Sequence, residues 1–189
     1  MIRPFEILTT DIEGLYLINP FVAYDERGYF IKDYSKEIFE KSGIVHDLKE
    51  AFYTNSHKGV IRALHFQRVH GQAKLVRCVH GRIYDVVVDL RAGSKTFKKW
   101  LAFELSEENK MELLIPEYCG HGYLVLEDAI VTYKCSEKFY GEYDDGILWD
   151  DADIGIDWPL DIVDNQIILA EKDLKWQTFK QFVDSYGGL

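Results

Sequence analysis

Between Gly59 and Lys134 the sequence is a series of short apolar runs, separated by turn residues at intervals of roughly ten residues. The runs are rich in Val, Ile, Leu and aromatic residues, which fit the pleated surface of a sheet. They are VIRALHF (60–66), KLVRCV (74–79), RIYDVVVDL (82–90), WLAFEL (100–105), MELLIP (111–116) and GYLVLED (122–128). This spacing predicts an all-β sandwich or barrel, with any helices flanking it.

Two segments outside these runs are typical of short helices. Segment 35–43, SKEIFEKSG, opens with a candidate N-cap, Ser35, and closes at Gly43. Near the C-terminus an apolar helical stripe is formed by Trp176, Phe179, Val183 and Tyr186. The 189 residues contain no linker, which predicts one domain over 1–189, with an N-terminal arm (about 1–50), a barrel core (about 51–150) and a C-terminal helical tail (about 170–187).

The charge balance limits the partners. There are 22 Lys and Arg against 32 Asp and Glu, a net charge of −10. Such a chain repels a phosphate backbone, so nucleic-acid binding is not expected. It can bind a small anion only where basic side chains gather in a pocket.

The cysteines and the N-terminus suggest a compartment. Cys78, Cys119 and Cys135 are odd in number and form no C-x-x-C pair, so no disulfide framework or Cys-rich zinc site is expected. Each lies among apolar residues, as an inert core thiol would. The opening MIRPFEILTT lacks the apolar stretch of a signal peptide, and no later segment could span a membrane. We therefore expect a cytoplasmic protein.

The run RIYDVVVDL alternates between two faces. Period-two geometry places Tyr84, Val86, Val88 and Leu90 on one face, and Ile83, Asp85, Val87 and Asp89 on the other. Two carboxylates on one strand face mean that this face meets water, a binding cavity or basic partners.

Four side chains are candidates for proton transfer or charge stabilisation. His65 lies in an apolar strand and could exchange a proton near neutral pH, although this segment alone favours a core histidine whose ring nitrogens are satisfied by neighbours. Lys74 could steady an enolate oxygen or simply reach into solvent. Tyr133 could act as a general acid or only pack, and Asp173 could cap the last helix.

A metal site is not expected. The segment IPEYCGHGYLVL (115–126) resembles the second metal-binding box of single-domain β-barrels. The first box should then supply two further histidines and a carboxylate. Here His65 is followed by Phe66 and Gln67, and the position wanted for the acidic ligand holds Lys74, whose ammonium repels a cation.

The order and spacing of the motifs carry a resemblance. The chain is similar to the dTDP-4-dehydrorhamnose 3,5-epimerase family of cupins over most of its length. The matching motifs are DERGYF (25–30), GVIRALHFQ (59–67), QAKLVRCVHG (72–81), VDLRAGSKTFKKW (88–100), ELSEENK (104–110), LLIPEYCGHGYLVL (113–126), YKCSEKFY (133–140), GILWDDADIGIDWP (146–159) and AEKD (170–173).

The resemblance implies a homodimer of jelly-roll barrels that epimerises C3 and C5, or C3 alone, of a nucleotide-linked 4-keto-6-deoxy sugar for surface-polysaccharide synthesis. It implies no cofactor. The nucleotide would be dTDP, with GDP and CDP as alternatives. The family's base falls on His65, its orienting carboxylate on Asp173, its acid on Tyr133, and Lys74 lies near the keto oxygen. Substrate contacts fall on Arg27, Phe30, Arg62, His121 and Phe139.

Two features of the sequence bear on these roles. Arg62 and His65 are three residues apart, so they would point to opposite faces of a regular strand, and a bulge or twist is needed to bring both to one site. Phe139 stands at the second position of the family's Tyr-Tyr pair, which removes a hydroxyl from the pocket. Two alternatives remain open: a 3,4-ketoisomerase acting on the same substrates, and a sugar-nucleotide-binding cupin without catalysis.

Overall fold

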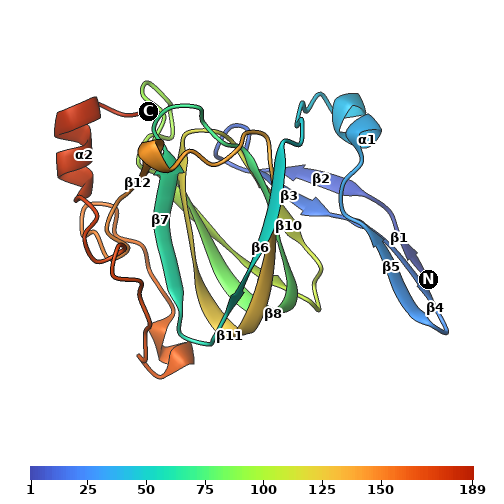
Figure 1. Ribbon diagram of the computed structural model, residues 1–189. Coiled ribbons are helices and arrows are strands. Elements are labelled where there is room, and N and C mark those ends of the chain that lie inside the picture. Colours follow the sequence, from blue (N-terminus) through green and yellow to red (C-terminus); the bar gives the residue numbers. More distant parts are fainter.

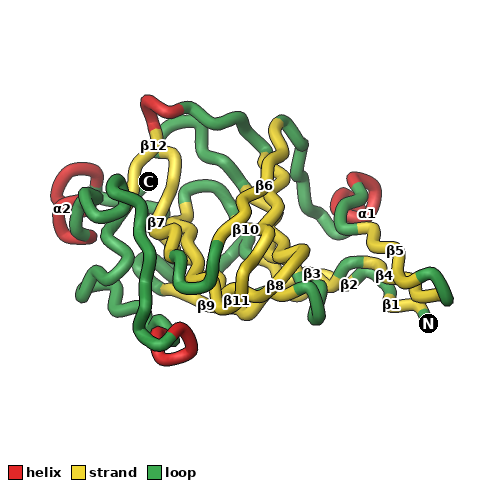
Figure 2. Tube along the Cα trace, turned by 60° about the horizontal axis from the view of Figure 1, so that its bottom comes forward, coloured by secondary structure: helices red, strands yellow, loops and turns green.

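The computed structural model describes residues 1–189, and its main element is an antiparallel sheet of nine strands that curls into a barrel (Figures 1 and 2). Seven strands follow the order β12-β7-β11-β8-β10-β3-β2, while β6 pairs with β11 and β9 pairs with β8. Their bounds are β2 Glu6–Thr9, β3 Tyr16–Asn19, β6 Glu50–Ser56, β7 Ile61–Gln67, β8 Lys74–Asp89, β9 Trp100–Ser106, β10 Glu112–Ile115, β11 Cys119–Cys135 and β12 Asp144–Gly146. The all-β, cupin-type prediction is confirmed.

Two long strands join the halves of the barrel. The runs predicted at 74–79 and 82–90 form a single strand, β8, and the run at 122–128 is the middle of β11. The register between β8 and β11 shifts between Val125 and Glu127, and again near Ile130, and these irregularities bend the pair. The first half of β11 therefore pairs with β7 and the second half with β6. The same strand thus supplies side chains to both sides of the barrel mouth.

The alternation predicted for 82–90 is confirmed, and both faces are buried. Ile83 and Val87 lie in the core cluster inside the barrel, whereas Val86, Val88 and Leu90 lie in a second cluster. The second cluster includes Phe179 and Phe182 of the C-terminal segment, so this segment covers the outer face of the sheet. Burial on both sides explains why this strand is nearly continuous in apolar residues.

An N-terminal arm projects from the barrel on the side opposite α2 (Figure 1). It is a three-stranded sheet, β1-β4-β5, of β1 Ile2–Arg3, β4 Phe21–Asp25 and β5 Gly28–Lys32. The predicted helix at 35–43 is confirmed as α1, Lys36–Lys41, although the Ser35 side chain forms no cap hydrogen bond. Phe39 of α1 packs with Ile18, Leu75 and Leu114 in a third cluster.

The C-terminal helix is shorter than the sequence suggested. Two 3₁₀ turns, Gly141–Tyr143 and Leu160–Val163, precede it, and α2 spans only Phe179–Tyr186. Thr178 caps α2 in a reciprocal capping box with Gln181, so the expectation that Asp173 caps this helix is wrong. Residues 170–178 form turns instead, held to the barrel by backbone hydrogen bonds such as that from Leu148 to Gln177. Neither helix is long enough to cross a membrane.

Candidate active site

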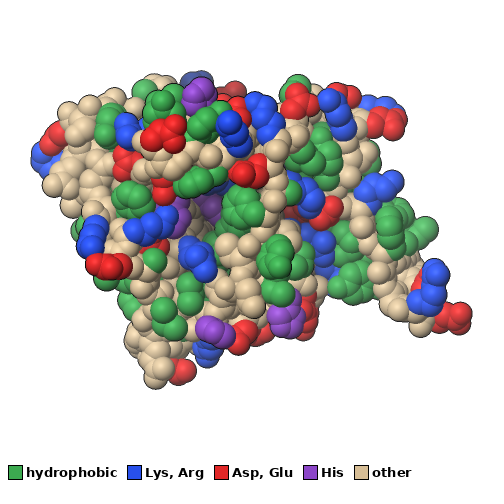
Figure 3. All heavy atoms as spheres, in the orientation of Figure 1, with side chains coloured by type: hydrophobic (Ala, Val, Ile, Leu, Met, Phe, Trp, Pro, Cys, Tyr) green, Lys and Arg blue, Asp and Glu red, His purple; other side chains and the backbone are tan.

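A cavity of about 200 Å³ opens at the barrel mouth, lined by residues of β6, β7, β8 and β11 and of the segment before α2. Figure 3 shows it as a hollow with histidine side chains at its base. Its lining residues include seven of the nine predicted site residues, namely Arg62, His65, Lys74, His121, Tyr133, Phe139 and Asp173. Two further predicted residues, Arg27 and Phe30, are not among them.

His65 is held by a buried carboxylate. Its Nε2 lies 2.8 Å from Oδ1 of Asp173, which also accepts a hydrogen bond from the Trp176 indole at 3.2 Å. The side chain of Asp173 is 1% exposed, and that of His65 is 24% exposed. Burial would raise the pKa of Asp173, but the hydrogen bond and charge of His65, followed by Trp176, lower it overall. An ionised carboxylate can only accept hydrogen bonds, so Nε2 carries the hydrogen and Nδ1 keeps a free lone pair.

Tyr133 lies deep in the same cavity. Its ring stacks on Phe52, directly opposite on β6, with centroids 4.6 Å apart and planes at 15°. The edge of the His121 ring approaches it from another side, 6.0 Å away. Burial, followed by the neighbouring Tyr123 and Asp85, raises the pKa of the Tyr133 hydroxyl well above its ordinary value. Tyr133 therefore keeps its proton at neutral pH, as a general acid must.

Two cations of the cavity lack a carboxylate partner. Lys74, at the start of β8, forms neither a hydrogen bond nor an ion pair, and burial lowers its pKa against the opposing influence of Cys135, Asp144 and Asp85. Arg62 donates from Nε to the hydroxyl of Ser56 at 3.1 Å. The two carboxylates that line the cavity are already engaged, Asp173 with His65 and Asp144 with Lys172. The cavity thus has free positive charge in a chain of net negative charge.

His121 is bound to a second carboxylate. Its Nε2 lies 3.0 and 2.9 Å from the two oxygens of Asp85, and both side chains are buried. Of the alternatives predicted for this strand face, Asp85 therefore meets a basic partner, His121, which lines the cavity. No group of three or more His, Cys, Asp and Glu side chains is arranged to hold a metal ion.

A bulge in β7 brings Arg62 and His65 to one cavity, as their spacing required. On β11 the partners of His65 and Arg62 are His121 and Tyr123, so three steps along β7 face only two along β11. The peptide bond between Ala63 and Leu64, inside this bulge, is cis. The two strands come so close here that β11 has a glycine, Gly122, against Ala63.

We expect Gly122→Ala to destabilise the protein by about 2–3 kcal/mol, because overpacking at a site that cannot relax carries a cost of this size. The added Cβ would lie 2.3 Å from Cβ of Ala63 and 2.8 Å from its Cα and from the Arg62 carbonyl oxygen. Thermal unfolding measures the effect. Gly141→Ala is the control, because its Cβ meets only Phe139 at 3.7 Å, and equal melting temperatures for the two variants would contradict the close approach.

Two predicted substrate contacts lie elsewhere. Arg27 is at the tip of the β4–β5 hairpin, where its guanidinium is 85% exposed and paired with Asp25. Phe30, on β5, is 58% exposed. They do not line the cavity of the chain that carries them, because the arm extends away from the barrel mouth, and their contact with substrate stays a prediction.

Several lining residues were not singled out in the sequence. They come from β6, β11 and β12, from the segment between β7 and β8, and from the segment before α2, and they include Phe52, Thr54, Gln72, Tyr123, Asp144 and Lys172. Gln67 and Gln72 mainly hold backbone, since Gln67 bonds His70 and Tyr140 and Gln72 bonds Glu137. Strand alternation could have selected Thr54, had β6 been recognised.

The three cysteines are buried and unpaired. Burial raises the pKa of Cys78 and of Cys119 to about 12 and that of Cys135 to about 11. They are therefore protonated at neutral pH, in agreement with the prediction of inert core thiols.

Comparison with known proteins shows which family has this sequence and fold. The family model of dTDP-4-dehydrorhamnose 3,5-epimerase matches residues 9–181. An epimerase of that name from Methanothermobacter thermautotrophicus is 46% identical over 178 residues, covering 94% of this chain and 96% of the relative. The enzyme from Escherichia coli is 39% identical over 180 residues, covering 94% and 96%.

A solved structure bears on the ligand of a relative. The Legionella pneumophila 3,5-epimerase in complex with dTDP-4-keto-L-rhamnose superposes with a TM-score of 0.89, at 35% identity over 94% of each chain. The barrel and the comparisons together define a cupin-type isomerase. The chain belongs to the dTDP-4-dehydrorhamnose 3,5-epimerase family, as its motifs indicated.

Proposed function

We propose that this protein epimerises C3 and C5 of a dTDP-linked 4-keto-6-deoxy sugar by acid–base catalysis. The observation that carries the proposal is the convergence of a carboxylate-bound histidine, His65, and a buried, protonated tyrosine, Tyr133, on one cavity. The sugar nucleotide would supply the carbonyl that makes the neighbouring C–H bonds acidic. Its product would feed surface-polysaccharide synthesis, as the membership of the family suggests.

The charge of the cavity supports an anionic substrate. Arg62 and Lys74 have no carboxylate partner, so a diphosphate would gain attraction without having to break an ion pair. The name of the Legionella complex supports dTDP as the nucleotide. His121, fixed by Asp85, would present a polar edge to the sugar or phosphate, and Phe139 would cover the mouth of the cavity.

Inversion would proceed in two proton transfers. Nδ1 of His65 takes the proton from C3, the C–H electron pair forms the C3=C4 double bond, and the carbonyl oxygen becomes an enolate oxygen. Lys74 stabilises that oxygen, since a positive charge in a water-poor site is worth most where negative charge develops. Tyr133 then returns a proton to the opposite face of C3, which inverts the carbon and leaves a phenolate. Asp173 holds the tautomer of His65 throughout.

Repetition at C5 would complete the reaction. The same carbonyl acidifies the C5 hydrogen. Before the second inversion, solvent takes the proton from His65 and returns a proton to the Tyr133 phenolate, which restores the base and the acid. A Streptomyces bikiniensis 3'-monoepimerase in complex with dTDP-quinovose, 30% identical with a TM-score of 0.87 over 95% of this chain and 90% of that one, is a relative whose name limits it to one centre. We place the choice between one and two inversions at Phe139, which brings no hydroxyl to the mouth.

The substrate proposal is tested by incubating the protein with dTDP-, GDP- and CDP-linked 4-keto-6-deoxyglucose in deuterium oxide. We expect a mass gain of two deuterons, fastest with the dTDP sugar. A mass gain with only the GDP- or CDP-linked sugar would overturn the proposal that the nucleotide is dTDP. A C3-ketone product would favour a 3,4-ketoisomerase. Binding without any deuterium uptake would favour a cupin that only binds sugar nucleotides.

Tyr133→Phe should separate the two proton transfers. The variant keeps the base but loses the acid, so deuterium exchange at C3 should persist while net inversion falls by about 10²-fold or more. Proton NMR in deuterium oxide measures both rates on one sample. Equal loss of exchange and inversion would show that Tyr133 does not act as the acid.

We propose that the protein is a cytoplasmic homodimer in which the arm of each copy reaches the cavity of the other. Aromatic side chains on the arm, Tyr29 at 53% and Phe30 at 58%, are exposed in the single chain and would be covered in such a dimer. Arg27 and Phe30 would then contact substrate across the interface. Light scattering should give twice the mass of the chain, and a single-chain mass would exclude this arrangement.

A further inference from the structure

Tyr123 carries a buried hydroxyl for which the mechanism above has no use. It lies on β11, is 1% exposed, and belongs to the apolar core cluster inside the barrel. A phenylalanine would fill this core equally well, whereas a buried hydroxyl is unfavourable unless it is hydrogen-bonded. The presence of a hydroxyl at this position therefore has to be explained by something other than core packing.

The hydroxyl of Tyr123 is held at the wall of the cavity. Oγ1 of Thr54, on the neighbouring strand β6, lies 2.8 Å from it. The next inward-facing residue of β6, Ser56, accepts the hydrogen bond from Arg62. Tyr123 and Thr54 both line the cavity, so this pair is part of the site and not of the distant core.

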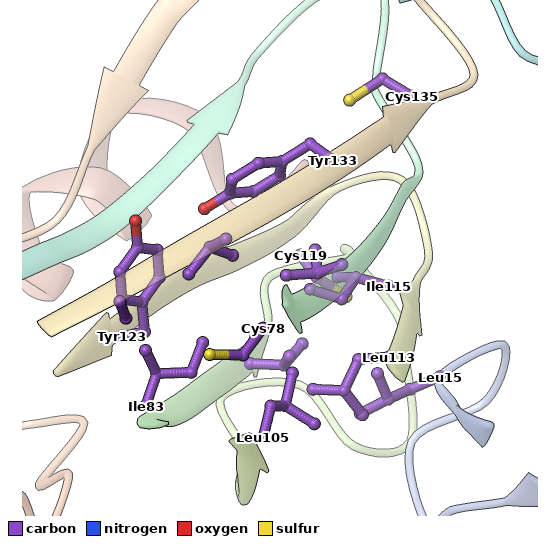
Figure 4. Packing of buried hydrophobic residues seen from close by; sticks show 14 of the residues in the cluster. Leu15, Cys78, Ile83, Leu105, Leu113, Ile115, Cys119, Tyr123, Tyr133 and Cys135 are labelled. Atoms are coloured by element: carbon purple, nitrogen blue, oxygen red, sulfur yellow. The ribbon is translucent and has the colours of Figure 1, made fainter. Parts of the chain in front are cut away.

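The hydroxyls of Tyr123 and Tyr133 face each other. Figure 4 shows both rings in the same cluster, with the Tyr133 oxygen directed toward the end of the Tyr123 ring. The stack on Phe52 and the edge of His121 fix the Tyr133 ring, so this orientation is imposed from two sides. This orientation brings the Tyr133 oxygen toward the hydroxyl of Tyr123.

We infer that Tyr123 is a positioning residue for Tyr133, and this rests on the proposed function, in which Tyr133 is the acid. In the resting site burial, followed by the neighbouring Tyr123, raises the pKa of Tyr133, so Tyr133 is the donor of this pair, while Thr54 anchors the Tyr123 hydroxyl. When Tyr133 gives its proton to carbon, its O–H bond breaks, a C–H bond forms, and the Tyr123 hydroxyl turns to donate a hydrogen bond to the phenolate oxygen.

The geometry favours the transition state over the ground state. A hydrogen bond to a charged oxygen is stronger than one to a neutral oxygen, so the contact from Tyr123 strengthens as negative charge develops on Tyr133. The proton taken by His65 remains on the imidazole until solvent exchanges it. Loss of the Tyr123 hydroxyl should therefore slow return of the proton from Tyr133 and leave the first step unaffected.

Tyr123→Phe tests this inference in deuterium oxide with dTDP-4-keto-6-deoxyglucose. We expect the ratio of net inversion to deuterium exchange at C3 to fall about tenfold or more, as loss of one hydrogen bond to a charged group implies. Thr54→Val should lower the ratio in the same direction, and Thr54→Ser, which keeps the hydroxyl, should restore it. A merely structural role would lower both rates together and leave the ratio unchanged.

Tyr53→Phe is the matched control, because Tyr53 adjoins Thr54 on β6 but is 70% exposed and outside the cavity. Its ratio should equal that of the wild type. An active wild type whose ratio is unchanged in Tyr123→Phe would overturn this inference alone. A wild type that exchanges no deuterium would overturn the proposed function, and this inference with it. If Tyr123→Phe does not fold, the ratios measured for Thr54→Val and Thr54→Ser test the inference in its place.

Discussion

Replacing His65 with Asn is expected to lower deuterium uptake at C3 by about 10²–10⁴-fold, the usual contribution of a positioned general base. Asn is close in size and keeps a polar side chain, but it cannot accept a proton near neutral pH. Binding of the sugar nucleotide should change little, because Arg62 and Lys74 carry the free positive charge and remain in place. Mass spectrometry of the substrate in deuterium oxide measures the rate.

His80→Asn controls for the loss of a histidine. His80 is exposed, bonds Glu107, and lies on β8 outside the cavity, so its replacement should leave the exchange rate at the wild-type value. Exchange that survives His65→Asn at the wild-type rate would remove His65 from the base role. Exchange lost in both variants would point to a general disturbance of the fold.

Asp173→Asn is expected to lower kcat by about 10²–10⁴-fold with KM nearly unchanged. The carboxylate accepts the hydrogen on Nε2 of His65, whereas an amide can donate to that nitrogen and stabilise the other tautomer. The hydrogen would then lie on Nδ1, the atom that has to take the proton, and a comparable change in a Ser-His-Asp triad lowers kcat about 10⁴-fold. Steady-state kinetics separate kcat from KM.

The His65–Asp173 pair also contributes to the stability of the folded protein. The pKa of Asp173 is lowered in the folded protein, so the pair stabilises the fold at neutral pH. This contribution is present above the ordinary carboxyl pKa and is lost as the pH falls through the lower folded-state pKa. Asp184→Asn is the control for the kinetic effect of Asp173→Asn, because Asp184 forms an exposed pair with Lys180 on α2 and does not line the cavity. A KM effect of the same size as the kcat effect would argue that Asp173 serves binding instead of tautomer control.

The sequence predicted the barrel well because local patterns, namely apolar alternation and the spacing of turn residues, mark most of its strands. Alternation in 82–90 assigned both faces of β8 correctly, and the spacing of Arg62 and His65 demanded the bulge that the structure contains. The sequence did not show that the runs at 74–79 and 82–90 join into the single strand β8. A bend within a strand keeps the backbone extended while the intervening His80 and Gly81 look like a turn.

The sequence predicted that the residues proposed for proton transfer share one site, but it did not identify the side chains that hold them in place. His65, Lys74, Tyr133 and Asp173 meet in one cavity, as the order of their motifs implied. The partners that fix them, such as Asp85 for His121, lie on other strands, and a single sequence does not record which residues face each other across a sheet.

The arm illustrates a different limit. Arg27 and Phe30 stand in a motif that resembles the family's, yet the chain folds them away from its own cavity. A linear motif marks a role without stating which copy of the chain provides it. A contact between two copies of the chain can be seen neither in a sequence motif nor in the structure of one copy.

The central claim is that one imidazole removes a proton beside a carbonyl and one phenol replaces it from the other side. Proton NMR of wild-type protein with dTDP-4-keto-6-deoxyglucose in deuterium oxide tests it most directly. We predict deuterium at C3 and C5 of a product in which both centres are inverted. Deuterium found only with retained configuration, or inversion with no deuterium in the sugar, would contradict it.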